Sequence, residues 1–178
     1  MLLGSKVCEK GEGPEPWLTG GYGDVDALRR GVLHAFDLGL EELEHWCGGL
    51  SDAEMNARPF GIAPVAFHLR HIARSLDRLL TYAEGGSLSG EQLEALRGEL
   101  TEGAKWDDVF AELRGAVRLS SERVRAISAE RYEEIRAVGR EQLGASLGGL
   151  LVHLADHTQR HVGQAITTAK VVVGQRQS

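Results

Sequence analysis

Four long segments carry apolar residues at the three- and four-residue spacing of an amphipathic α-helix, and this pattern constrains the fold more than any other feature. The first expected helix covers residues 25–47, with Asp24 as its cap, and the second runs from Pro64 to Gly85-Gly86. The third begins at Asp107 or Asp108 and continues to about 128, and the fourth covers about 146–172. Helices with one apolar face bury that face against one another. The pattern therefore predicts an all-α fold, with a four-helix bundle domain over residues 24–178.

The rest of the chain is expected to form loops and short elements. Residues 1–23 contain several glycines and two prolines, which predicts an irregular N-terminal arm, with Trp17 and Tyr22 as its expected anchors. Residues 129–144 lose the helical periodicity and are expected to form a connection, with a brief extended piece at 135–138. No convincing strands are expected elsewhere in the chain.

Charge and cysteine content limit the partner and the compartment. The formal net charge of -6 and the scattered basic residues argue against nucleic-acid and acidic-membrane partners. Arg70, Arg74 and Arg78 form a row opposite the apolar stripe of their helix, which is expected to be a solvated face. Cys8 and Cys47 do not make a disulfide framework, and no secretion signal or spanning segment is evident. A cytoplasmic protein is expected.

The last amphipathic segment contains His153, His157 and His161, each four residues from the next. Residues at this spacing lie on one helical face with Cβ atoms ~5–6 Å apart, close enough for two imidazoles to bind one metal ion. At ~100° per residue, His161, His157 and His153 lie about 40°, 80° and 120° from the centre of the apolar stripe. The first two therefore border the core, where burial is costly unless their ring nitrogens find partners.

Two further histidines, His68 and His71, lie on the helix that begins near Pro64. Periodicity places His68 about 60° and His71 about 120° from the centre of its stripe, at ~100° per residue. A bundle can bring this flank against that of His157 and His161. Three histidine ligands leave one position of a divalent ion open, as in catalytic zinc sites, and similar sets suit nickel or iron.

Two rival metal motifs fit the sequence poorly. The helical zinc-protease motif requires Glu directly after its first His, whereas Leu154 follows His153 and Thr158 follows His157. Carboxylate-bridged di-iron bundles require two Glu-x-x-His motifs, and only the segment 42–45 matches. A haem bundle held by two histidines stays open as an alternative, although the Cys-x-x-Cys-His attachment motif is absent.

His71-Ile72-Ala73 in the second helix, together with His157-x-x-x-His161 and the following Gly163-Gln164, resembles the DinB/YfiT-like superfamily over most of the chain, from about 24 to 173. The resemblance implies a bundle with an up-down-down-up course, commonly a homodimer. It also implies a divalent metal ion, zinc or nickel, bound by three histidines.

Carried over residue by residue, the metal ligands that the resemblance implies are His71, His157 and His161. Periodicity places His68 closer to the core, but the motif register selects His71 because Ile-Ala follows it. His68 and His153 become candidates for the pocket wall or for contacts behind the ligands, and Asp156 becomes a candidate to orient a ligand ring.

Relatives of this kind include metal-dependent thiol-S-transferases and thiol-dependent isomerases. The resemblance therefore implies an enzyme that transfers a low-molecular-weight thiol, as co-substrate, to an electrophilic small molecule. On the ligands alone, a hydrolase that uses a metal-bound hydroxide fits as well. A non-catalytic bundle that binds a metal or small ligand is the third hypothesis, and nothing in the sequence identifies the thiol or the electrophile.

Overall fold

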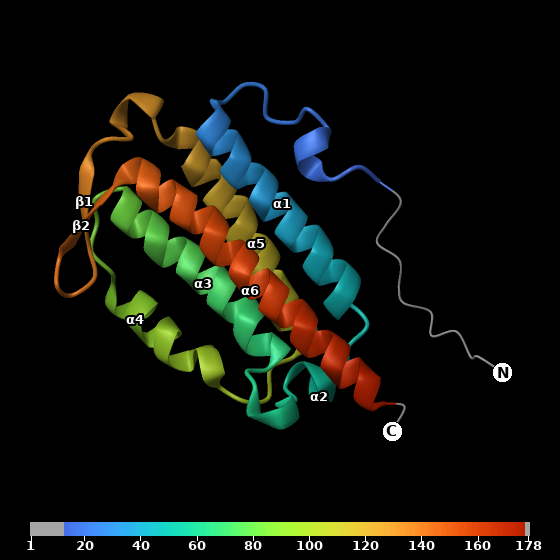
Figure 1. Cartoon of the computed structure of the whole chain (residues 1–178). Helices are drawn as coiled ribbons and strands as arrows, with labels where there is room; N and C mark the ends of the chain where they lie inside the picture. The colour runs from blue at the N-terminus through green and yellow to red at the C-terminus, as the bar shows by residue number, and fades with distance from the viewer. Residues whose placement is uncertain (1–12, 177–178) are drawn as a thin grey trace.

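The computed structural model describes residues 13–176 and is mostly helical, as expected (Figure 1). The helices are α1 (Ala27–Cys47), α2 (Asp52–Met55), α3 (Val65–Ala83), α4 (Gly90–Arg97), α5 (Trp106–Ala126) and α6 (Leu147–Gln175), and the strands are β1 (Ile135–Val138) and β2 (Leu143–Ser146). The beginning of the expected arm, with Cys8, and the last two residues lie outside the described part. Within that part, no helix is both long and apolar enough to cross a bilayer.

The four long helices α1, α3, α5 and α6 share one apolar core. α6 packs against α1 and α3, and α5 packs against α3 and α1. Each long helix contributes fully buried side chains, among them Phe36, Leu69, Phe110 and Leu151. This packing sets α3 and α6 side by side (Figure 1), so the two histidine-bearing flanks face each other.

Two helices begin at residues other than the expected ones, because other groups satisfy their free backbone N–H groups. Asp26, rather than Asp24, caps α1, and its Oδ1 accepts a hydrogen bond from Leu28 N–H at 3.0 Å. α5 begins one residue before the acidic pair expected to open it. There the Asp52 carboxylate, from α2, accepts a hydrogen bond from Trp106 N–H at 2.8 Å.

The extended piece expected at 135–138 is present as β1, but it pairs with a second strand that the sequence did not indicate. β1 and β2 are antiparallel, with Ile135 opposite Ser146 and Val138 opposite Leu143. The second strand contains no β-branched or aromatic residue, so it lacks the composition by which strands are recognised. Its pairing with β1 supplies the backbone partners instead.

The arginine row of α3 is not a solvated face, and that expectation was wrong. Arg78 is buried, and Arg74 pairs with Glu112 of α5, with 2.6 Å between Nε and Oε1. Arg70 donates a hydrogen bond to the carbonyl of Thr101 at 2.8 Å. The segment after α3, including α4, folds back against α3 and covers this face.

One of the two expected anchors holds the described part of the N-terminal arm. The Tyr22 hydroxyl donates a hydrogen bond to Asp37 of α1 at 2.7 Å, and the guanidinium of Arg125 lies over the Tyr22 ring. Trp17 is 57% exposed, so its ring is not an anchor of this kind.

Gly39 lies at a close contact between α1 and α6. A Cβ at this position would lie 3.1 Å from Val162 Cγ2 and 3.3 Å from Gln159 Nε2. Gly39→Ala is expected to lower the free energy of unfolding by up to about 2 kcal/mol, because overpacking of about 1–3 kcal/mol exceeds the helix-propensity gain of about 1 kcal/mol. Urea denaturation measures this change in the free energy of unfolding. Gly31→Ala, on the same helix with no atom near the added Cβ, is the control and should stabilise; equal stabilisation by both variants would contradict the close contact.

Cys47 is fully buried at the end of α1, and burial raises the pKa of its thiol to about 12. Because the thiolate is the reactive form, we expect Cys47 to resist a disulfide reagent such as 5,5′-dithiobis(2-nitrobenzoate) at mildly alkaline pH. The measurement uses a Cys8→Ser variant, with a sample unfolded in guanidinium as the reactive control. Rapid, complete labelling of the native variant would show that the thiol is accessible.

Candidate metal centre

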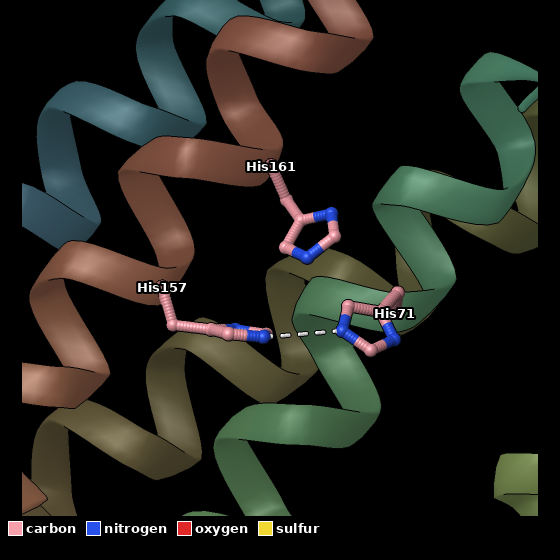
Figure 2. A group of neighbouring side chains, drawn as sticks. All are labelled: His71, His157 and His161. Atoms are coloured by element: carbon pink, nitrogen blue, oxygen red, sulfur yellow. Dashed lines mark hydrogen bonds between the residues drawn. The ribbon is translucent and has the colours of Figure 1, made fainter. Parts of the chain in front are cut away.

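Three histidine side chains meet where α3 lies against α6 (Figure 2). His71 comes from α3, and His157 and His161 come from successive turns of α6. One nitrogen from each ring lies within 4.8 Å of the others, and the Nε2 atoms of His71 and His157 are 3.2 Å apart. The four-residue spacing stacks the two α6 rings on one face, and the packing of the helices brings the third ring to them.

The surroundings of His157 and His161 favour neutral imidazoles. Burial, followed by the neighbouring His161 and His71, lowers the pKa of His157 to about 4. Burial and His71 likewise lower the pKa of His161 to about 4. A neutral ring offers the lone pair that a divalent ion requires. Three partly exposed nitrogen donors in one group could hold a divalent metal ion.

Glu99 holds the ring of His71 from behind. This carboxylate is 4% exposed, lies just beyond α4 and is 2.7 Å from His71 Nδ1. Its other oxygen accepts a hydrogen bond from Arg78 Nη1 at 2.7 Å. Burial would raise the pKa of Glu99, but the hydrogen bonds from His71 and Arg78 outweigh it and lower the pKa. The carboxylate accepts a hydrogen bond from the Nδ1–H of His71, so Nε2, which lies toward His157, is the nitrogen of His71 that remains for a metal ion.

Sequence reasoning missed Glu99. It is 28 residues from His71, in a polar segment whose other acidic residues are exposed, and no spacing connects it to a histidine. Arg78, which donates a hydrogen bond to Glu99, is likewise buried, although its face of α3 was expected to be solvated. A lone carboxylate in such a segment gives no local signal.

His68 lies beside the triad rather than within it. It is 5% exposed, as its position near the apolar stripe predicts, and its Nδ1 is 3.1 Å from His161 Nδ1. Burial, followed by His161 and His71, lowers its pKa to about 4. His68 therefore contacts the back of one triad ring, in the way that Glu99 contacts the back of another.

His153 and Asp156 lie toward the outside of α6. His153 is one turn before His157, with ring centroids 5.3 Å apart, and its Nδ1 is 3.9 Å from Asp156 Oδ2. Asp156 accepts a hydrogen bond from Arg160 at 2.8 Å. The hydrogen bonds of Asp156 thus do not reach the rings of the triad, and the carboxylate that contacts a triad ring is Glu99.

The fold and the triad define a class of protein, namely a mostly helical bundle with a candidate three-histidine metal centre between two of its helices. The family model described as the DinB superfamily matches residues 35–165, a range that contains all three histidines. The chain belongs to the DinB superfamily. A search of curated proteins finds no match to it.

Proposed function

We propose that the protein is a metal-dependent enzyme that transfers a low-molecular-weight thiol to an electrophilic small molecule. His71, His157 and His161 would hold one divalent ion, zinc or nickel. The observation that carries the proposal is that three imidazoles from two helices each offer one nitrogen, and that these nitrogens all lie within 4.8 Å of one another. Among residues 13–176, no fourth His, Cys, Asp or Glu belongs to this group. A set of three protein ligands leaves one coordination position open for water or substrate, as in catalytic rather than structural zinc sites.

When bound, such an ion lowers the pKa of a coordinated thiol or water and so supplies a nucleophile at neutral pH. The chain's own residues hold the ligand rings. Glu99 accepts a hydrogen bond from the Nδ1–H of His71, and His68 forms a hydrogen bond with His161. Partners of this kind fix ring orientation and tautomer in metal sites, and their loss typically weakens metal binding.

We also propose the up-down-down-up course for α1, α3, α5 and α6, a homodimer and a cytoplasmic location. The placement of α6 between α1 and α3 supports the first of these. The homodimer rests on the family resemblance alone, and light scattering tests it. The location rests on the sequence features described above.

The experiment is a screen of metal-loaded protein with cysteine and other small thiols against 1-chloro-2,4-dinitrobenzene. Product formed above the spontaneous rate, and lost both in metal-free protein and in a His157→Ala variant, supports thiol transfer. Hydrolysis of 4-nitrophenyl acetate without acceleration by any thiol favours the hydrolase. No metal-dependent turnover of either kind favours a non-catalytic metal-binding bundle.

A further inference from the structure

A cavity of about 640 Å³, open to solvent, lies beside the triad between the start of α3 and the middle of α6, and none of the three triad histidines lines it. Its apolar wall includes Ile62 and Ala63, which precede α3, and its polar wall includes His68, Arg160 and Gln164. None of the described residues that line it is acidic. His68 lines this cavity and also contacts His161, so it links the cavity to the triad.

The contact between His68 and His161 fixes where each ring carries its hydrogen. Their Nδ1 atoms are 3.1 Å apart, so one must donate and the other accept. With Nδ1 engaged in this way, Nε2 is the nitrogen of His161 left for a metal. The His161 ring reaches toward His71 and His157 (Figure 2). A ring that ligates through Nε2 keeps its hydrogen on Nδ1, so His161 donates and His68 accepts.

A neutral His68 that accepts at Nδ1 carries its own hydrogen on Nε2. Nε2 of His68 has no hydrogen-bond partner in the described part of the chain, and it is not among the fully enclosed polar atoms that lack one. Since His68 lines the cavity and its Nε2 has no partner among the described residues, we expect a molecule in the cavity to accept from this N–H.

Arg160 adds a positive charge to the same wall. Its Nη2 donates to Asp156 at 2.8 Å, in a half-exposed (i, i+4) pair. Arginine has five N–H donors, and an exposed pair of this type is weak, so the guanidinium retains donors and charge for a ligand. Donors on the polar wall and no carboxylate in the lining favour an anionic acceptor.

We propose that this cavity binds the carboxylate of a small-molecule substrate, with the Nε2–H of His68 and the guanidinium of Arg160 as donors and the apolar wall against its hydrocarbon part. The proposal names a substrate class for the proposed thiol transfer and rests on that function. It also assigns His68 a role in binding substrate in addition to its contact with His161.

The test is calorimetric titration of zinc-loaded full-length protein with butyrate, and with butyramide as a neutral probe of the same shape. Butyrate is expected to bind, and butyramide to bind at least about tenfold more weakly, since a hydrogen bond to a charged group is worth about 1.5–3 kcal/mol. Arg160→Gln and His68→Phe should each weaken butyrate binding about tenfold or more. His68→Gln should retain most of the affinity, because its amide can both accept from His161 and donate into the cavity.

Arg118→Gln is the matched control, because Arg118 forms an exposed (i, i+4) pair with Glu122 like that of Arg160 and Asp156. It should leave butyrate binding unchanged. Equal binding of butyrate and butyramide would overturn the proposal. So would undiminished butyrate binding in both Arg160→Gln and His68→Phe, which would place the carboxylate on the zinc ion. If the protein retains no zinc, the proposed function fails; butyrate binding to the metal-free protein, weakened by Arg160→Gln, would still support the cavity.

Discussion

His157→Ala is expected to reduce the metal content of the purified protein from about one divalent ion per chain to near zero. Its Nε2 lies 3.2 Å from that of His71. Removal leaves two imidazoles, and no other His, Cys, Asp or Glu of the described chain belongs to the group as a substitute. The measurement is elemental analysis of protein purified without chelators and dialysed against metal-free buffer. His161→Ala is expected to behave in the same way.

His153→Ala is the matched control for this prediction. It removes the same side chain one turn earlier on α6, where the imidazole is 44% exposed and lies beside Asp156. We expect its metal content to equal that of the wild type. Unchanged metal in His157→Ala or His161→Ala would reject the ligand assignment. Equal loss in His153→Ala would show that the metal depends on the general histidine content of the helix.

The long helices could be predicted because their signal is local. The apolar stripe of α6, for example, runs from Leu147 to Ala169, and these residues are buried in the structure. Apart from the local choice of Asp26 over Asp24 as the cap of α1, the main errors lie where a distant group decides the outcome. α5 begins at Trp106 because the carboxylate of Asp52, far away in sequence, satisfies its N–H. β2 exists because β1 pairs with it, and its own sequence carries no strand signal.

The candidate site was predictable to the same extent. Spacing placed His157 and His161 on one face, and the family motif selected His71 from the other helix. Periodicity alone would have selected His68, and it was right that His68 is the more buried of the two, because His68 is buried and His71 is half-buried. Burial and membership of the triad are different properties. The apolar stripe of a helix predicts which residues are buried, but only the packing of α3 on α6 determines which residues join the triad.

The carboxylate behind His71 could not be predicted at all. The sequence indicates for 87–105 only a polar segment with a short helix near 91–96, and such segments usually face solvent. Glu99 is buried because the segment folds back over α3, where Arg78 and His71 offer it two donors on one helical face. A contact of this kind depends on tertiary structure and has no counterpart in local periodicity.

Glu99→Gln is expected to weaken metal binding by about 10- to 100-fold, the usual effect of removing a partner behind a metal ligand. The carboxylate accepts from His71 Nδ1 through one oxygen and from Arg78 through the other, each at 2.7 Å. An amide has one oxygen and serves only one of these donors. Either the His71 ring loses the acceptor that fixes its tautomer, or buried Arg78 loses its charged partner. We therefore also expect a stability loss of about 1–3 kcal/mol.

Metal affinity is measured by competition with a chromophoric chelator, and stability by urea denaturation of the metal-free protein, so that the two effects are separated. Glu112→Gln is the matched control, because Glu112 pairs with Arg74 of the same helix α3 at 2.6 Å but contacts no histidine of the triad. It should leave metal affinity unchanged and cost at most about 1 kcal/mol, as a partly exposed pair does. If Glu99→Gln lowers stability while metal affinity stays at the wild-type value, Glu99 serves only to neutralise Arg78. The orientation of His71 must then come from the packing of α3 against α6.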